Sequence, residues 1–197
     1  MSDTSPYYDI RSSFFKEFFE AALPYDKYLQ SAKPEHQSKW NRLDPKPLLT
    51  SQQKAFLHAA TRKMNVLVMS GTWCGDCSRQ GPMLKAIADS SNVIDLRFID
   101  NHENPKLQDE LLINGAKKVP VIVVLSEDFF EIARFGDRHL SVYRRKIEQE
   151  TGTACDAGLI TPSDDEISQE LGEWVDFFER AHAVLRLAPM LRRRYND

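Results

Sequence analysis

The spacing of apolar residues along this chain changes between helical and strand-like, and each change marks an expected element. In the segment 9–23, pairs of phenylalanines lie one helical turn apart, which predicts a helix with one broad apolar face that Pro24 ends. Residues 31–49 contain three prolines and are expected to form an irregular connection. Thr50 and Gln53 have the spacing of a capping box, which predicts a further helix to about residue 63.

Strands and helices are expected to alternate through the middle of the chain. The runs NVLVMS, VIDLRFID, VPVIVVL and FFEIARF predict strands, and the last two should pair as a hairpin because only three residues separate them. Helices are expected after the first run to about residue 90, from Asn104 to Gly115, and around Leu140, Tyr143 and Ile147. This order predicts an α/β fold in which a mixed sheet carries helices on both faces.

The two ends of the chain are expected to be extensions of this central unit. Beyond residue 150 the sequence predicts a loop, and Ser163 with Glu166 then forms a second capping box ahead of a long amphipathic helix. Both terminal segments have apolar faces too short to fold alone. The predicted organisation is an N-terminal helical extension at 1–49, a central domain at 50–150, and a C-terminal loop and helix at 151–197 packed on that domain.

Composition and charge exclude several classes of protein. The 197 residues are 42% hydrophobic and 28% charged, which is typical of a globular domain rather than a disordered chain. The formal net charge of −3 provides no general attraction to nucleic acid, and no apolar run is long enough to span a bilayer. Three cysteines are too few for a disulfide-stapled scaffold, and the N-terminus has no secretory pattern. We therefore expect a cytoplasmic protein that binds neither nucleic acid nor membrane.

The stretch GTWCGDCSRQGP, residues 71–82, carries the strongest chemical signal in the chain. Cys74 and Cys77 are separated by two residues, directly after a predicted buried strand and directly before a predicted helix. A zinc site would need two more ligands, and the sequence contains no second CxxC and no HxxxH. A redox pair is therefore favoured over a metal site, and the remaining alternative is a cysteine pair retained in a domain that only binds a partner.

Residues 50–150 resemble thioredoxin. The resemblance rests on five features in the same order and spacing: Trp73-Cys74-Gly75-Asp76-Cys77, Pro82 five residues after the second cysteine, FID at 98–100, Val119-Pro120 before an apolar strand, and Gly136 after the hairpin. It implies a three-layer thioredoxin-like α/β fold, with helical extensions at both ends of the chain. It also implies a thiol–disulfide oxidoreductase with a role in redox homeostasis.

Each residue of the motif has an expected role. Cys74 would lie at a helix N-terminus, where free N–H groups and the helix dipole favour a thiolate, and is the expected nucleophile. Cys77, one turn further on, is the expected resolving thiol, and Gly75 would let the backbone approach a substrate. The resemblance implies that Pro120 is cis and faces the cysteines, and that Val119 offers its backbone N–H and C=O to a substrate. Trp73 is either core packing or a partly exposed platform beside the nucleophile.

The resemblance also suggests which molecules act with the chain. It implies no bound cofactor and no metal. The substrate would be a disulfide-containing protein or a small thiol compound, and electrons would come from an upstream reductase or a low-molecular-weight thiol. The alternative is a thioredoxin-fold adaptor without turnover. Cys155 is either a small loop residue or a third redox thiol, and nothing in its spacing decides between these roles.

Two departures from the thioredoxin pattern concern proton transfer and charge. Thioredoxins usually carry a buried aspartate six residues before the first cysteine and a lysine on the second strand, and Val68 and Leu96 stand here instead. Asp76 replaces the usual proline between the cysteines. A carboxylate about 6 Å from Cys74 would oppose its thiolate by on the order of 0.7–2.8 kcal/mol. The helix terminus favours the thiolate by only about 0.3–1 kcal/mol, so we expect that Cys74 is not strongly acidic. Arg79 could offset part of the Asp76 effect, and Asp76 could also accept a proton from the cysteine pair.

Overall fold

A mixed β-sheet forms the centre of the molecule, for which a computed structural model describes residues 7–42, 49–149 and 163–196. The sheet has five strands in the order β1-β3-β2-β4-β5. The strands are β1 (Leu23–Pro24), β2 (Met64–Ser70), β3 (Ile94–Asp100), β4 (Val121–Leu125) and β5 (Glu131–Gly136). Strands β2 and β3 are parallel, and each of the other neighbouring pairs is antiparallel.

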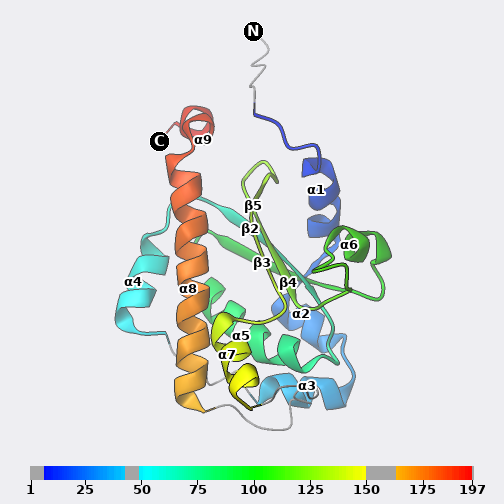
Figure 1. Ribbon diagram of the computed structural model, residues 1–197. Coiled ribbons are helices and arrows are strands. Elements are labelled where there is room, and N and C mark those ends of the chain that lie inside the picture. The colour runs from blue at the N-terminus through cyan, green and yellow to red at the C-terminus, as the bar shows by residue number, and fades with distance from the viewer. Residues whose placement is uncertain (1–6, 43–48, 150–162, 197) are drawn as a thin grey trace.

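Helices cover both faces of this sheet. They are α1 (Ser12–Ala21), α2 (Tyr25–Gln30), α3 (Pro34–Asn41), α4 (Ser51–Ala59), α5 (Gly75–Asp89), α6 (Pro105–Glu110), α7 (Leu140–Gln149), α8 (Asp164–Leu187) and α9 (Pro189–Tyr195). Figure 1 shows the sheet between α4 and α8 on one side and α1 and α6 on the other. The expected α/β fold with a central mixed sheet flanked by helices is thus confirmed. None of the helices in the described ranges has the length and hydropathy needed to cross a membrane.

The central strands are buried because their sequences are apolar on both faces. Every residue of β2 and β4 is buried, as expected for continuous apolar runs in the middle of a sheet covered on both sides. One hydrophobic cluster runs through the whole described chain, from Phe15 in α1 through Phe98 in β3 to Trp174 in α8. Both ends of the described chain therefore bury apolar side chains in the same core as the sheet.

The prediction of an irregular connection at 31–49 is wrong for residues 34–41, which form α3. Pro34 occupies the first turn of this helix, where its missing N–H removes no helical hydrogen bond. Trp40 near the other end is fully buried, and its ring packs against Tyr25 and Tyr28 of α2 and against Phe98. Tertiary burial of one tryptophan thus stabilises a short helix that has almost no amphipathic pattern. Residues 43–48 of the predicted connection lie outside the described residues.

Several predicted boundaries also shift. Helix α6 ends at Glu110 rather than at Gly115, which instead has a positive φ of 72° in the turn joining Ile113 to Ala116. Helix α4 ends at Ala59, a few residues before the predicted end near residue 63. The expected helix around Leu140 exists as α7, but all three apolar residues that predicted it are exposed: Leu140, Tyr143 and Ile147.

Both capping boxes and the hairpin are confirmed. Thr50 accepts the N–H of Gln53 and Ser163 accepts that of Glu166, and in each case the third residue's side chain returns to the cap's backbone N–H. Strands β4 and β5 pair antiparallel, as their short connection requires. The predicted loop after residue 150, which contains Cys155, lies outside the described residues.

Helices α3 and α5 approach each other through a glycine. A Cβ atom added at Gly81 in α5 would lie 2.2 Å from Cζ3 of Trp40, a distance that real Cβ atoms do not show. The indole therefore occupies the space that a side chain at position 81 would fill. This contact brings α3 against the helix that begins just after Cys74.

The substitution Gly81→Ala is expected to lower the free energy of unfolding. Alanine favours a helix over glycine by about 0.5–1 kcal/mol, but overpacking a buried contact costs about 1–3 kcal/mol, and the clash with Trp40 should dominate. Urea denaturation measures this change. The matched control is Gly172→Ala in α8, where an added Cβ meets nothing within 4 Å, and this variant should be slightly stabilised. Equal stabilisation of both variants would contradict the tight contact.

Candidate active site

Helix α3 holds the loop before Cys74 in place through two contacts with Thr72. Trp40 Nε1 donates a hydrogen bond to the carbonyl oxygen of Thr72 at 3.0 Å, and His36 Nδ1 lies 3.0 Å from the Thr72 hydroxyl oxygen. Gly71 permits the loop to fold, because a Cβ there would lie 2.6 Å from Nε1 of Trp73. The segment that the sequence predicted to be irregular therefore positions the backbone that carries the first cysteine.

Cys74 forms the N-cap of α5. The backbone N–H of Cys77 donates to Cys74 Sγ at 3.5 Å, so the sulfur occupies the position that a capping oxygen usually takes. Cys74 is 8% exposed and Cys77 is 1% exposed, and both are free thiols. Both thiols are therefore buried, and the Cys77 thiol is the more enclosed of the two.

The surroundings move the two thiol pKa values in opposite directions. A hydrogen bond from the Cys77 thiol, together with the Cys77 N–H, lowers the pKa of Cys74, while burial and the Asp76 carboxylate oppose this change. Burial, followed by the hydrogen bond to Cys74 and repulsion from its thiolate, raises the pKa of Cys77 well above its ordinary value. At neutral pH Cys74 is therefore the more readily ionised sulfur of the pair.

Val119 and Pro120 face the first cysteine across the site. The Val119–Pro120 peptide bond is cis, and the Cys74 thiol donates to the Val119 carbonyl oxygen at 3.7 Å. The segment is fixed by Asp137, whose N–H donates to the Pro120 oxygen at 2.9 Å and whose carbonyl accepts from Gln80 Nε2 at 2.7 Å. Asp137 and Gln80 thus link this segment to α5 by hydrogen bonds. Four of the residues predicted from sequence lie together here: Cys74, Cys77, Val119 and Pro120.

The charge of Asp76 is balanced by a residue that the sequence analysis did not identify. Arg138 lies 2.7 Å from Asp76 through Nη2 and Oδ2, and a second contact runs from Nε to Oδ1 at 3.1 Å. Arg79, which was expected to offset Asp76, instead pairs with Glu170 of α8, with Nε 2.9 Å from Oε2. That expectation was wrong because Arg79 projects toward α8, where the fully buried Glu170 carboxylate also accepts from Arg145.

Trp73 is a partly exposed platform rather than a core residue. Its side chain is 47% exposed, and its ring lies 5.6 Å from that of His102 in the loop after β3. Gly75 is the first residue of α5 and is half-buried beside the sulfur. An exposed aromatic surface therefore lies next to Cys74.

No group of three potential metal-ligating side chains occurs within residues 7–42, 49–149 and 163–196. The two cysteines are thus without further ligands for a zinc ion in this part of the chain. The site's chemistry consists of one capped thiol, one enclosed thiol and a backbone carbonyl facing the first. Such an arrangement can attack a disulfide and then form an internal one.

A family model described as thioredoxin matches residues 22–146 of the chain. Among solved structures, a protein of unknown function from Pseudomonas aeruginosa is 21% identical, with a TM-score of 0.67 over 84% of this chain and 97% of its own. An HIV epitope-scaffold is 20% identical, with a TM-score of 0.59 over 85% of this chain and 92% of its own. At these identities the two structures support the thioredoxin-like fold alone. No curated protein matches the chain.

Replacing Asp76 by Asn is expected to lower the pKa of Cys74. The carboxylate disfavours the thiolate, so its removal should shift the pKa downward by about half a unit to one unit. Replacing Arg138 by Met should shift it upward, because the Asp76 charge is then unbalanced. The pH dependence of Cys74 alkylation in a Cys155→Ser background measures both shifts. Shifts of the same sign in both variants would show that the ion pair does not control Cys74.

Proposed function

The chain belongs to the thioredoxin family, and on this premise we propose that it is a thiol–disulfide oxidoreductase that reduces protein or small-molecule disulfides through Cys74 and Cys77. The observation that carries the proposal is the capping of α5 by Cys74 Sγ, which accepts the Cys77 N–H at 3.5 Å. A helix N-terminus stabilises a thiolate with unsatisfied N–H groups and with its dipole. A thiolate is the species that attacks a disulfide.

The first step is attack on the substrate. The Cys74 thiolate attacks one sulfur of a substrate disulfide, the substrate S–S bond breaks, and one substrate sulfur leaves as a thiolate that takes a proton from solvent. An extended substrate would lie along Val119, whose carbonyl oxygen is 3.7 Å from Cys74 Sγ. The half-exposed Trp73 ring would contact the substrate beside the reacting sulfur.

The second step releases the substrate. Cys77 loses its proton, and its thiolate attacks Cys74 Sγ in the mixed disulfide, so that the Cys74–Cys77 disulfide forms and the second substrate sulfur departs. An upstream reductase or a low-molecular-weight thiol then supplies two electrons to restore the dithiol. The lower exposure of Cys77, 1% against 8% for Cys74, supports this order of steps.

Replacing Cys77 by Ser is expected to trap mixed disulfides. Without the resolving thiol the covalent complex with Cys74 persists, and non-reducing gels or intact-mass spectrometry of the Cys155→Ser protein would detect it under oxidising conditions. The matched control is Cys74→Ser, which should trap nothing because its remaining thiol is 1% exposed. Equal trapping by both variants, or by neither, would favour an adaptor domain without turnover.

The dithiol is expected to be a reductant rather than a strong oxidant. Burial raises the pKa of Cys77 well above its ordinary value. The hydrogen bond from Cys77 lowers the pKa of Cys74, but burial and the Asp76 charge oppose it, so the reduced form is stabilised as a thiolate at one sulfur only and against these two effects. A titration in defined thiol–disulfide buffers should give a two-electron midpoint near about −270 mV rather than near about −120 mV. The more positive value would contradict the proposed direction of the reaction.

A further inference from the structure

Helix α7 is attached to α8 through polar contacts on its inner side. The Glu173 carboxylate of α8 accepts the backbone N–H groups of Leu140 and Ser141 at 3.0 and 3.1 Å, and so caps the start of α7. Arg145 of α7 pairs with the buried Glu170 of α8. Capping and ion pairing therefore contribute to the attachment of α7, and they occupy the acidic side chains of α8 that contact it.

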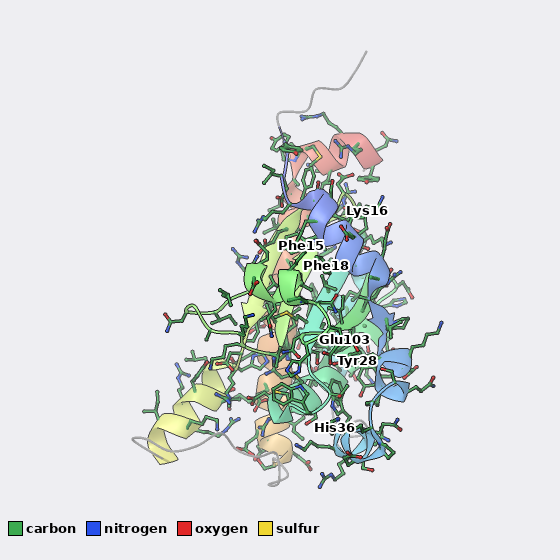
Figure 2. The ribbon with its side chains drawn as sticks, turned by 90° about the vertical axis from the view of Figure 1, so that its right-hand side faces the viewer. Phe15, Lys16, Phe18, Tyr28, His36 and Glu103 are labelled. Atoms are coloured by element: carbon green, nitrogen blue, oxygen red, sulfur yellow. The ribbon has the colours of Figure 1, made fainter. Side chains whose placement is uncertain are left out.

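The other side of α7, which we call its outer face, is apolar and exposed. Its four residues have the i, i+3, i+4, i+7 spacing of one helix face, and all are exposed: Leu140, Tyr143, Arg144 and Ile147. An amphipathic helix normally buries such an apolar face. Figure 2 shows α7 (yellow) at the outer edge of the molecule, with no other described helix or strand beyond it. The outer face is therefore available to another molecule.

The outer face begins beside the segment that faces Cys74. The Tyr143 hydroxyl donates to Asp137 Oδ2 at 2.6 Å, and the Asp137 N–H donates to the carbonyl oxygen of Pro120 at 2.9 Å. Lys118 Nζ lies 3.2 Å from the same carboxylate oxygen. One buried carboxylate thus joins the cis-proline segment to the first turn of α7, and it also holds the Tyr143 ring in place.

The charge of the outer face is positive. Arg144 lies in the middle of the face and has no ion-pair partner among the described side chains. The Lys118 side chain at the start of the face is 44% exposed. A second copy of this chain, packed symmetrically on the face, would bring like charges together. The same charges attract an acidic partner, which is therefore favoured over self-association.

The length of the outer face favours a protein partner over a small compound. A helix advances about 1.5 Å per residue, so Leu140 and Ile147 lie about 10 Å apart along the helix axis. A small disulfide compound held at Cys74 does not extend over such a surface, whereas a polypeptide that passes Val119 can continue over Tyr143. Tyrosine and arginine are also among the residues that contribute most to binding in protein interfaces.

We propose that the outer face of α7 docks a protein substrate whose disulfide is flanked by apolar and acidic residues. This inference rests on the proposed function and narrows its substrate class from disulfides in general to disulfides of proteins. Apolar side chains of the substrate pack on Leu140 and Ile147, and a substrate carboxylate pairs with Arg144. Docking holds the substrate disulfide near Cys74 and leaves the reactivity of the sulfur itself unchanged.

Two disulfide-linked peptide pairs test the proposal. The acidic pair carries leucines and glutamates beside its cysteines, and the basic pair carries lysines in place of the glutamates. A fluorophore and a quencher on the two halves separate when the disulfide breaks. The reduced Cys155→Ser protein supplies two electrons, so that its Cys74–Cys77 disulfide forms and the peptide disulfide becomes two thiols. Hydroxyethyl disulfide, a small uncharged compound followed by intact-mass spectrometry, reports the reactivity of Cys74 without docking.

Two substitutions on the outer face are expected to act on the peptides alone. Ile147→Ser should lower the second-order rate constant for the acidic pair by about fivefold to tenfold, because apolar contact with the peptide is lost. Arg144→Glu should lower the constant for the acidic pair and raise it for the basic pair, and both effects should weaken as the salt concentration rises. Both variants should reduce hydroxyethyl disulfide at the unsubstituted rate.

The matched control is Leu187→Ser. Leu187, the last residue of α8, is 75% exposed, and Ile147 is 70% exposed, so the two substitutions remove similar amounts of apolar surface. Figure 1 shows α9, which follows this end of α8, at the opposite end of the molecule from α7. The control variant should therefore leave all the rate constants unchanged.

Each contrary result has a distinct meaning. Unchanged peptide rates in both outer-face variants overturn the docking face, while reduction of hydroxyethyl disulfide leaves the oxidoreductase intact. With peptide rates unchanged, a dimer that Ile147→Ser disrupts in sedimentation velocity would show that a second copy occupies the face. A lower free energy of unfolding in that variant would show instead that the face packs within the chain.

Two further outcomes also count against the proposal. Equal slowing with all the substrates, or the same slowing in Leu187→Ser, would show an effect that is not specific to docking and would overturn it. If the unsubstituted protein reduces neither peptide pair and does not reduce hydroxyethyl disulfide, the proposed function fails together with this inference.

Discussion

The burial of the Trp40 indole is the contact on which the arrangement of the site depends. Its ring fills the space above Gly81 and packs on Tyr25, Tyr28 and Phe98, and its N–H holds the Thr72 carbonyl. One side chain therefore joins α3, the loop before Cys74, the middle of α5 and the end of β3. The N-terminal segment is thus part of the site's support.

Charges on the opposite side of α5 are matched by residues from later in the chain. Arg138, which follows β5, balances Asp76, and Glu170 of α8 holds Arg79 and Arg145. Removing one member of such a buried group leaves an uncompensated charge, which is far more costly than the net gain of forming the group. The local electric field at Cys74 is therefore controlled by segments that are distant from the CxxC motif in sequence.

The two thiols face opposing physical demands. Cys74 gains from the N–H groups at the start of α5, whereas Cys77 is enclosed and must ionise in surroundings that disfavour charge. A buried carboxylate near such a thiol would add a second charge that needs compensation. The apolar side chain of Val68, which is buried at that position, avoids this cost.

Local sequence was sufficient to predict the features that depend on neighbours along the chain. The apolar runs of β2 and β4, both capping boxes, the β4–β5 hairpin and the position of the CxxC at a helix start all follow from spacing over a few residues. The α3 helix and the early end of α6 could not be predicted in this way, because Trp40 is buried by other elements and Gly115 belongs to a tight turn.

Tertiary structure alone determined which groups surround the two sulfurs. Arg138 pairs with Asp76, and Arg79 turns toward Glu170. None of these pairings has a sequence signal, since their members are tens to about ninety residues apart. Periodicity and capping arise from short-range backbone geometry, whereas charge compensation and buried hydrogen bonding depend on which elements the packed core brings together.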